Sequence, residues 1–556
     1  MRRKETLWMV PAVLIAILPL ALGRGQAAGS KNAGSPATDI SGIFDVRSFG
    51  ARGDGKALDS PAVNKAIEAA AAAGGGTVRF PAGAYRCFSI HLKSNISLYI
   101  DQGATIVAAS PSDGDGKYDP PEPNQWDQYQ DFGHSHWHNS LIWGENLENV
   151  SILGPGMIWG KGLVRSGDDS RTAAQNEALR SLKADQRGPF GYPNKRDAVE
   201  PGWGNKSISL KLCRNVVIRD VSILHGGHFA ILATGVDNLT IDNLKIDTNR
   251  DGIDIDACRN VRVSNCSVNS PFDDGICPKS TFGLGYARAT ENVTITNCQV
   301  SGFDEGTFLD GTYKREYARY SHKSPTGRIK FGTESNGGFK NITISNCVFS
   351  YSRGLALETV DGGLLEDVTI DNITMRDITS APIFLRLGSR MRGPKDTPVG
   401  SLRRILISNV VVFNAEPGCA SIISGVPGHD IEDLKLSDIH IYYKGGGTKE
   451  QAALEPPEKE NEYPEPFMFG DTSSYGFFIR HVKNLEVSNV SVSFMKEDVR
   501  PPFVLTDVKG ADFQHIKSQR AQGSPTFVLK DVTDFSTHEC LPVPDMRLDR
   551  VETKRL

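Results

Sequence analysis

Short stretches of alternating apolar and polar residues recur along most of the chain, and nearly all begin with Asn or Asp. Copies in the middle of the sequence read NVVIRDVSIL from Asn215, NLTIDNLKID from Asn238 and NVRVSNCSVN from Asn260. Further copies begin at Asn149, Asn292, Asn341, Asp367, Arg404, Asp433 and Asn484. Where the spacing is tightest, the starts fall 22 or 23 residues apart. Alternation with a period of two predicts two short β-strands in each copy, joined at a polar corner.

One such repeat is too small to bury its own apolar face, whereas a stack of repeats buries these faces in one continuous core. The chain is therefore expected to be an all-β protein, a right-handed parallel β-helix, and not three or four separate domains. The right hand follows from the general preference of parallel strand crossovers. Asn suits the recurring corner because it tolerates a left-handed backbone and its amide can stack on the next repeat.

The clearest helical segment is 59–73, DSPAVNKAIEAAAAA, with Asp59 or Ser60 as N-cap and Pro61 in the first turn. Solenoids need covered ends, so we expect this helix to cap the N-terminal end of the β-helix. The cap and the first rungs together are expected within residues 41–110.

The β-helix domain is predicted to run over residues 41–535. Within it, residues 446–470 interrupt the repeats with Pro and Glu and are expected to form a surface loop. Residues 536–556 are expected to form a C-terminal tail.

The N-terminus has the pattern of a secretion signal over residues 1–28: a basic start, an apolar stretch and small residues near Ala27 and Ala28. An uncleaved anchor helix is the alternative, and Pro11 and Pro19 within the apolar stretch disfavour it. We expect cleavage, a linker over 29–40, and a soluble mature protein that is exported to the periplasm or the extracellular space. No association with a membrane is expected after cleavage.

Composition limits the expected partners. The 556 residues include 39% hydrophobic and 23% charged residues, which is ordinary for a globular protein. A net charge of -4 gives no reason to expect a nucleic acid as partner. A monomer is the default expectation for a capped solenoid.

Nine cysteines do not form a recognisable disulfide framework. Cys266, Cys298 and Cys347 recur at one place in the repeat, in the phrases VSNCSV, ITNCQV and ISNCVF. We interpret them as buried small apolar residues and not as metal ligands, because the chain contains no C-x-x-C pair. One or two disulfides among the other cysteines remain an open alternative.

Five aspartates stand close together in TNRDGIDIDACRNVRVSNCSVNSPFDDGICPKS, residues 248–280. Asp251 precedes Asp273 and Asp274 by 22 and 23 residues, which is the tightest repeat spacing. Residues one repeat apart lie on adjacent rungs, about 4.8 Å apart along the axis. The spacing therefore predicts one patch of three carboxylates on the outside of the β-helix.

Such a patch suits glycoside hydrolysis. Inversion needs a protonated carboxylic acid for the leaving oxygen and a carboxylate that activates water, separated by roughly 6.5–9.5 Å. Crowded like charges raise at least one pKa and so keep an acid protonated near neutral pH. Aspartates without a role at solvated turns, or a calcium site, are the alternative interpretations.

Two quoted segments and one motif carry a family resemblance. FDVRSFGARGDGKALDSPAVNKAIEAAAAAGGGTVRFPAGAY (44–85) and LIWGENLENVSILGPGMIWGKG (141–162) resemble the first part of the pectin-degrading β-helix enzymes. Residues 249–254 match N-x-D-G-x-D, and Asp273, Asp274 and Lys279 match the D-D and Lys that follow it. Together these residues resemble the polygalacturonases, glycosyl hydrolase family 28. The resemblance extends from 44 to about 390 and more loosely beyond.

The resemblance implies hydrolysis of pectic poly- or oligosaccharides without a metal or organic cofactor. It implies Asp273 as general acid, and Asp251 and Asp274 as the residues that activate water. Asn249 and Lys279 are implied at the substrate. Asp254 is expected to shape the turn or orient a partner, and Asp256 has no expected role.

Two motifs of the family are not intact. Gly327 stands where the family has the His of G-H-G, and Ala356 and Glu358 replace the Arg and Lys of R-I-K. Family members hold a uronate carboxylate with that Arg and Lys, so Glu358 is expected to repel it. The candidates that would compensate are Lys279, Arg328, Lys330, Arg386, His228 and His322. A rhamnogalacturonan or another uronate-containing glycan is therefore an alternative substrate.

Two functions of other classes remain alternatives. A pectate lyase would use calcium and a basic residue such as Lys279 for β-elimination. A catalytically silent, carbohydrate-binding β-helix would explain the missing His, Arg and Lys. Long insertions at 112–140 and 301–325 are expected to close one end of the cleft, which favours action at chain ends over action within the chain.

Overall fold

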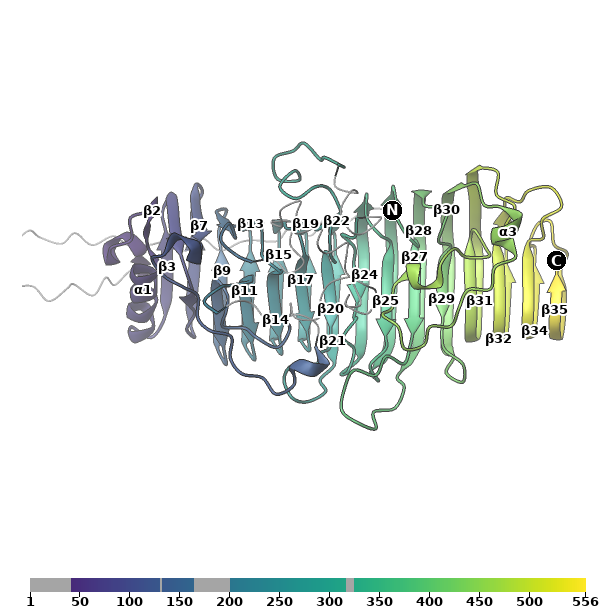
Figure 1. Cartoon of the computed structure of the whole chain (residues 1–556), viewed down its shortest axis with the longest axis horizontal. Coiled ribbons are helices and arrows are strands. Elements are labelled where there is room, and N and C mark those ends of the chain that lie inside the picture. The colour runs from purple at the N-terminus through teal and green to yellow at the C-terminus, as the bar shows by residue number, and fades with distance from the viewer. Residues whose placement is uncertain (1–41, 131–132, 165–200, 317–324) are drawn as a thin grey trace, which may run out of the picture. The chain divides into compact units, whose positions relative to one another are not determined.

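The rungs of the predicted β-helix are present in the computed structural model, which describes residues 42–130, 133–164, 201–316 and 325–556. The proposed signal peptide and linker, residues 1–40, lie outside the described residues. Figure 1 shows strand after strand stacked along one axis from β2 to β35. The strands pair in parallel from rung to rung, for example β14 (Phe229–Thr234) with β17 (Asp251–Asp256).

The elements follow in chain order. The N-terminal elements are β1 (Ile43–Asp45), η1 (Val46–Phe49), β2 (Asp54–Leu58), α1 (Ser60–Ala72), β3 (Gly76–Phe80), β4 (Gly83–Cys87), β5 (Ile90–His91), β6 (Ile96–Ile100), β7 (Ala104–Ala108), η2 (Pro111–Asp113) and η3 (Asp127–Tyr129). The central strands are β8 (Ile142–Glu145), β9 (Glu148–Leu153), β10 (Met157–Trp159), β11 (Lys206–Lys211), β12 (Arg214–Arg219), β13 (Ser222–Leu224), β14, β15 (Asp237–Asp242), β16 (Lys245–Asp247), β17, β18 (Arg259–Ser264), β19 (Ser267–Asn269), β20 (Ile276–Lys279), β21 (Thr290–Thr296) and β22 (Gln299–Ser301). The later elements are β23 (Lys330–Phe331), β24 (Phe339–Ser350), β25 (Leu355–Thr359), β26 (Leu364–Arg376), β27 (Ile383–Leu387), β28 (Ser401–Ala415), β29 (Ser421–Ser424), β30 (Ile431–Gly445), α3 (Lys449–Ala452), η6 (Pro466–Phe469), β31 (Phe477–Lys496), β32 (Phe503–Gln514), β33 (Lys517–Ser518), β34 (Phe527–His538) and β35 (Met546–Arg555).

The strands form a long parallel sheet and a shorter one, which runs β5, β8, β11, β14, β17 and β20. Inside the shorter sheet Ile208, Ile231, Ile253 and Ile276 stand in register and have no exposed surface. Each such side chain contributes about 1.5–3 kcal/mol through burial, so the column holds successive rungs together. The residues between them point outward, which puts Asp254 of β17 on the outer face.

The recurring asparagines form the expected ladder. Asn149, Asn215 and Asn238 have positive φ, as a corner residue of this kind requires. Each Nδ2 donates to the Oδ1 of the asparagine one rung before, over 2.8 to 3.3 Å. The ladder comprises Asn95, Asn149, Asn215, Asn238, Asn260, Asn292 and Asn341. The interpretation of these residues as structural corners is confirmed.

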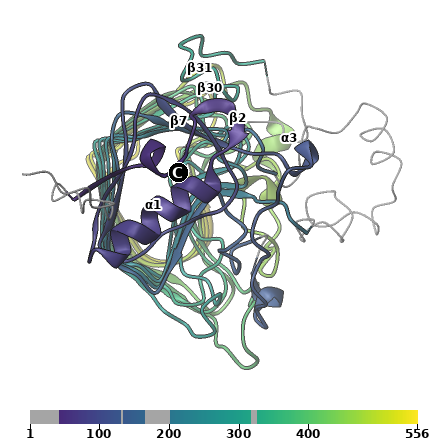
Figure 2. The same ribbon diagram turned by 90° about the vertical axis from the view of Figure 1, so that its left-hand side faces the viewer.

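The predicted helix is α1, and its buried side Val63, Ala66, Ile67 and Ala70 packs against the first strands. Figure 2 shows it lying across the N-terminal rungs. The expected N-cap hydrogen bond is absent, because the Asp59 carboxylate accepts from the amides of Arg52 and Gly53 instead, at 2.7 and 3.0 Å. Its role as the cap of the solenoid stays a prediction.

Two further segments bear on the predicted organisation. Residues 446–470 contain α3 and η6, and Pro464, Glu465 and Pro466 within them are buried, so part of this loop packs on the β-helix. Residues 536–556 hold the end of β34 and the antiparallel strand β35, which pairs with it.

All nine cysteines are free, and Cys266, Cys298 and Cys347 are buried, which confirms their interpretation as small core residues. Among the described residues no helix has both the length and the apolar character that crossing a membrane requires.

Candidate active site

Asp251, Asp273 and Asp274 lie together, as their spacing predicts. Asp251 begins β17, and the other two precede β20 in the turn of the next rung. The Gly252 amide donates to the Asp274 carbonyl over 3.0 Å, which aligns the two rungs. One carboxylate oxygen of each aspartate lies within 4.8 Å of the others. The patch is not on an open surface, however, because only the Asp273 side chain is appreciably exposed, at 26%, while Asp251 and Asp274 are buried.

Arg250, directly before β17, contacts Asp273 with its Nη2 2.6 Å from Oδ2. Burial alone would raise the pKa of Asp273. The charge of Arg250 and a hydrogen bond with Asp251 outweigh burial and hold this pKa below its ordinary value. In the unliganded site Asp273 is therefore ionised.

Asp251 has the opposite electrostatics. Burial, then the nearby carboxylates of Asp254 and Asp273, raise its pKa well above the ordinary value. Because Asp251 and Asp273 are hydrogen-bonded, the pair shares one proton, which rests on Asp251 in the unliganded protein.

Asp274 contacts two of the basic residues expected to compensate for the missing family motif. Arg328 Nε lies 2.8 Å from its Oδ1, and Lys330 Nζ lies 3.3 Å from its Oδ2. Both cations come from the rung after β20 and are buried. The structure therefore brings Arg328 and Lys330 into the candidate site.

Glu358 also lies in this cluster, but not as an isolated negative charge. Its carboxylate is 3.6 Å from Lys330 Nζ and 4.0 Å from Arg328 Nη2. Burial raises its pKa to about 8, against the lowering effect of these two cations. The expectation that Glu358 repels a substrate carboxylate is wrong, because it is faced by two cations and largely protonated at neutral pH.

The loop 446–470 reaches this end of the site. Glu465 lies 2.5 Å from Arg328 Nη2 and 3.0 Å from Arg353 Nη1. The hydroxyl of Tyr463 accepts a hydrogen bond from Thr333 Oγ1 at 2.9 Å. The predicted surface loop thus covers the C-terminal side of the carboxylate cluster.

Lys279, at the end of β20, lies 3.6 Å from Asp251, 3.8 Å from Asp254 and 3.6 Å from Glu334. Burial alone would lower its pKa, but the negative charges around it raise the pKa well above its ordinary value. Lys279 therefore stays protonated, and a base for β-elimination cannot be this residue at neutral pH.

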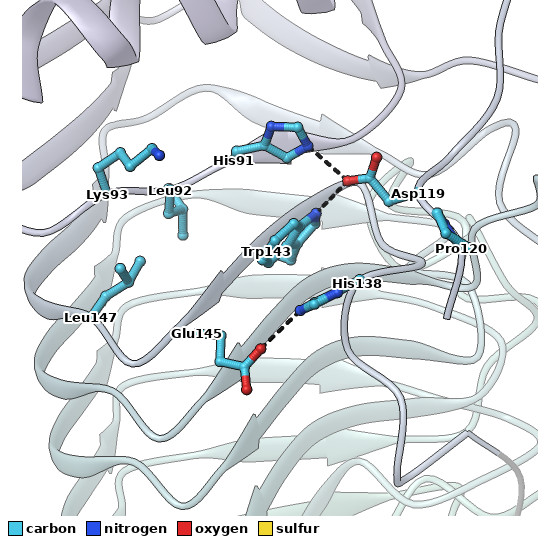
Figure 3. Close-up of a pocket in the computed structure, with 9 residues that line it drawn as sticks. All are labelled: His91, Leu92, Lys93, Asp119, Pro120, His138, Trp143, Glu145 and Leu147. Atoms are coloured by element: carbon cyan, nitrogen blue, oxygen red, sulfur yellow. Dashed lines mark hydrogen bonds and ion pairs between the residues drawn. The ribbon is translucent and has the colours of Figure 1, made fainter. Parts of the chain in front are cut away.

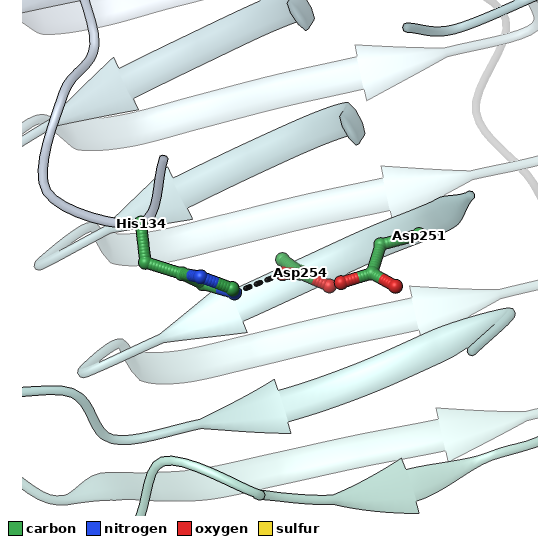
Figure 4. A group of neighbouring side chains, drawn as sticks. All are labelled: His134, Asp251 and Asp254. Carbon is green, nitrogen blue, oxygen red and sulfur yellow. Dashed lines mark ion pairs between the residues drawn. The ribbon is translucent and has the colours of Figure 1, made fainter. Parts of the chain in front are cut away.

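Asp254 is part of the site and not only of the turn. Its Oδ2 lies 3.3 Å from His134 Nε2, and burial raises its pKa to about 8 (Figure 4). His134, Asp251 and Asp254 each offer one ligand atom within 4.8 Å of the others, as a metal site would. Lys279 already contacts both carboxylates, so the cluster has a positive charge of its own and does not require an ion.

Lys206, at the start of β11, is a buried cation that sequence reasoning missed. It stands in register with Phe229 and Asp251, two rungs from the carboxylates. Its Nζ donates to Asn205 Oδ1 at 2.6 Å and to Asn139 Oδ1 at 3.3 Å. No carboxylate of the described residues forms an ion pair with it, and burial lowers its pKa to about 7.

The remaining predicted residues differ in their placement. His228 is buried, and burial together with the charge of Arg250 lowers its pKa, so it is neutral beside the site. Asn249 accepts from the Phe272 amide through its backbone carbonyl at 3.0 Å. Arg386 lies outside the cluster, because its guanidinium donates to Ser424 Oγ and to carbonyls of the loop 446–470. His322 lies outside the described residues.

Asp256, which had no expected role, is structural. It accepts from the Thr281 amide at 2.7 Å and from the Thr281 hydroxyl at 2.8 Å. These bonds tie β17 to the end of the next rung.

Several site residues were missed because they come from other parts of the chain. His134 lies in the loop before β8, Glu334 follows β23, and Glu465 lies some 200 residues beyond the aspartates. Nothing in their local sequence signals the contact. Arg250 is different, since it stands inside the matched motif and could have been found there.

Comparisons with known proteins agree with this architecture. A family model described as "Right handed beta helix region" matches residues 202–314, and one described as "Rhamnogalacturonase A/epimerase, pectate lyase-like" matches 43–139. The fold is a right-handed parallel β-helix. Its predicted handedness is confirmed.

The relatives carry the names that the resemblance implies. The exo-poly-alpha-D-galacturonosidase of Dickeya chrysanthemi is 24% identical over 376 residues, which is 63% of this chain and 58% of that protein. A probable polygalacturonase of Vitis vinifera is 23% identical over 479 residues, 80% of this chain and 84% of that one. The structure of the Yersinia enterocolitica family 28 exopolygalacturonase covers 84% of this chain and 78% of its own, with 18% identity and a TM-score of 0.59. The chain is similar to the polygalacturonases, as its motifs predict.

Proposed function

We propose that the protein is an exported glycoside hydrolase of the polygalacturonase type, which cleaves glycosidic bonds in pectic polysaccharide. The observation that carries the proposal is the cluster of Asp251, Asp273 and Asp274 on adjacent rungs, one pair of which shares a proton. The names of the relatives support the substrate class. The protein would act as a monomer outside the cytoplasm.

Asp273 is the proposed general acid because, of the three carboxylates, it alone is appreciably exposed and so within reach of a glycosidic oxygen. Asp273 receives its proton from its hydrogen-bonded neighbour Asp251, which holds the proton before substrate binds. Asp274, which contacts Arg328 and Lys330, then activates water together with Asp251 after the proton has moved.

The resemblance implies inversion at the anomeric carbon. The nearest oxygens of the three carboxylates lie within 4.8 Å. This is closer than the roughly 6.5–9.5 Å between the carboxyl groups of most inverting glycosidases, and nearer to the about 5–5.5 Å of retaining ones. Geometry and resemblance therefore differ, and the anomeric configuration of the first product, read by NMR, decides between inversion and retention.

Action at chain ends is the proposed mode, because loops cover the cluster from two sides. On the N-terminal side, Trp137 is buried on Phe229 and Leu232 of β14. On the C-terminal side, Glu465 and Tyr463 of the loop 446–470 pack on the cations of the site. Two such walls favour binding of a chain end at the cluster over binding of the middle of a long polymer.

The acidic character of the proposed substrate is supported by Lys206. Arg250, Lys279, Arg328 and Lys330 each contact at least one carboxylate of the protein. Among the described residues, Lys206 Nζ has amide oxygens as hydrogen-bond acceptors and lies 5.7 Å from the centre of the Phe229 ring, and it forms no ion pair with a carboxylate. A buried cation is costly without such a negative charge. A uronate carboxylate one or two sugar units from the cleaved bond would provide that charge.

Incubation with polygalacturonate, methyl-esterified pectin and rhamnogalacturonan oligosaccharides tests the proposal. New reducing ends on polygalacturonate and its short oligomers are expected, released as small products from chain ends. Cleavage of rhamnogalacturonan alone would move the substrate to that alternative. Unsaturated products that absorb in the ultraviolet would identify a lyase, and binding without any product would identify a silent carbohydrate-binding protein.

A further inference from the structure

A second concave site lies on the outer face of the same sheet, outside the carboxylate cluster. A cavity of about 480 Å³ opens between β5 and β8, and none of its lining residues belongs to the cluster (Figure 3). A volume of this order holds a small organic ligand such as one or two sugar rings.

The lining combines the two surfaces that a sugar ring presents to a protein. Leu92, Leu147 and the indole of Trp143 provide an apolar floor for its C–H faces. His91, Asp119 and Glu145 stand at the rim and provide hydrogen-bond partners for hydroxyl groups.

Hydrogen bonds fix these side chains before any ligand is present. Asp119 Oδ2 accepts from Trp143 Nε1 at 2.8 Å and contacts His91 Nε2 at 2.7 Å. His138 lies flat against Trp143 with 4.0 Å between ring centroids, and its Nε2 is 2.9 Å from Glu145. A rigid wall reduces the entropy lost on binding, which is a property of ligand sites more than of incidental clefts.

Both rim carboxylates remain ionised acceptors. Burial opposes this, but the pKa of Asp119 is lowered by hydrogen bonds with His91 and Trp143. Lys211 and His138 lower that of Glu145 in the same way. Lys93 lies 3.1 Å from the more exposed Glu68, in a surface ion pair of the kind that contributes little to stability.

The cavity is aligned with the candidate active site but separated from it. Trp143 stands in register with Ser209, Leu232 and Asp254 on the next three rungs. Asp254 of the candidate active site is therefore three rungs from Trp143, or about 14 Å at about 4.8 Å per rung. Trp137 lies between them, packed on Leu232, with Lys211 Nζ 4.4 Å from its ring centre. A carbohydrate chain that passes over this wall meets the cavity next.

We propose that this Trp143 cavity is a second carbohydrate-binding site, which holds one or two sugar units of the polysaccharide remote from the bond that is cleaved. The proposal rests on the proposed function for the identity of the sugar. Binding there lengthens the time that the polymer spends near the carboxylate cluster. It does not raise the affinity for a substrate that is too short to reach both sites.

Titration of the full chain carrying Asp273→Asn with trigalacturonate, followed by calorimetry, tests the site directly. Two binding events per chain are expected, and one when Trp143→Ala is added. Trp159→Ala is the matched control, since Trp159 is a partly exposed tryptophan on another strand, and it should leave two events. Equal stoichiometry with and without Trp143→Ala would overturn the proposal.

Kinetics of variants that keep the catalytic aspartates give the second readout. Trp143→Ala should lower kcat/KM on polygalacturonate about tenfold, which is 1.4 kcal/mol, and leave kcat/KM on trigalacturonate unchanged. Equal loss on both substrates, or on neither, would contradict a second site. Asp119→Ala, which removes the acceptor of the Trp143 Nε1 hydrogen bond, serves in its place if the Trp143→Ala variant does not fold by circular dichroism.

Failure of the two proposals can be told apart. If the natural protein cleaves neither substrate but Trp143→Ala still removes one binding event, the proposed function fails and the carbohydrate site stands. If both substrates are cleaved and the stoichiometry does not change, the carbohydrate site alone fails.

Discussion

The guanidinium of Arg250 lies 2.6 Å from the carboxylate of Asp273 and keeps this aspartate ionised, while its hydrogen-bonded neighbour Asp251 holds the proton. Two aspartates of one site thus differ in charge because their surroundings differ. One is paired with a cation and partly exposed, and the other is buried among carboxylates. This asymmetry makes the roles of the two aspartates separable by experiment.

Asp273→Asn is expected to lower kcat/KM on oligogalacturonate by a factor of about 10²–10⁴, because general acid catalysis is lost. A nitrophenyl galacturonide has a leaving group that needs no protonation, so Asp273→Asn should retain much of its turnover. Asp251→Asn should lose turnover on both substrates. The reverse pattern, with rescue of Asp251→Asn alone, would assign the acid to Asp251.

Arg250→Gln should move the alkaline limb of the kcat/KM profile to higher pH. Arg250 favours the ionised form of Asp273, so its loss raises the proton affinity of the Asp251–Asp273 pair. The pair then keeps the proton that catalysis needs to a higher pH. The profile of Arg259→Gln is the matched control, because Arg259 of β18 pairs with Glu291 of β21 and contacts no aspartate of the cluster. A limb that shifts in neither variant would show that the Asp251–Asp273 pair is not the group that titrates.

Lys206→Met should raise KM for oligogalacturonate about tenfold and change KM for its methyl ester little, since the ester has no carboxylate to pair with the ammonium. Lys245→Met is the control, because Lys245 is an exposed lysine on β16, outside the shorter sheet that carries the site. Equal KM values of Lys206→Met and the natural protein on the free acid would refute the role of Lys206.

The same variant carries a pH signature in stability. The folded protein holds the pKa of Lys206 at about 7, below the about 10.4 of an unfolded lysine. Between these values the unfolded chain binds the additional proton, so stability from this residue rises with pH. Measured by thermal unfolding, the Tm of Lys206→Met relative to the natural protein should be higher at pH 6 than at pH 9. A constant difference would mean that Lys206 does not titrate in this range.

Removal of metal ions should leave activity intact. Lys279 supplies the positive charge beside Asp251 and Asp254, and no step of the proposed mechanism needs a cation from solution. Reducing-end release is therefore expected to be equal with and without EDTA. A loss that calcium restores would favour the lyase alternative.

Repetition made the fold predictable, because each copy carries the same period-two pattern and the same corner asparagine. The 22- and 23-residue spacing placed Asp251 beside Asp273 and Asp274 for the same reason. The charge state of Glu358 was not predictable, since it depends on Arg328 and Lys330 from the preceding rung and on burial.

The contribution of His134 and Glu465 to the site was not predictable either, because loops of irregular length place them on the sheet. Local pattern thus determines the rungs, whereas the covering of the site depends on contacts between distant segments. The sequence therefore supports the catalytic role of the carboxylates more firmly than it identifies the residues that bind the substrate.

The release of reducing ends from polygalacturonate and its oligomers tests the central claim most directly, with the natural protein and Asp273→Asn measured side by side. Release by the natural protein and a loss of at least 10²-fold in the variant, with an unchanged circular dichroism spectrum, is the expected result. No reducing ends from any acidic pectic substrate, or equal release by both proteins, would contradict hydrolysis at this carboxylate cluster.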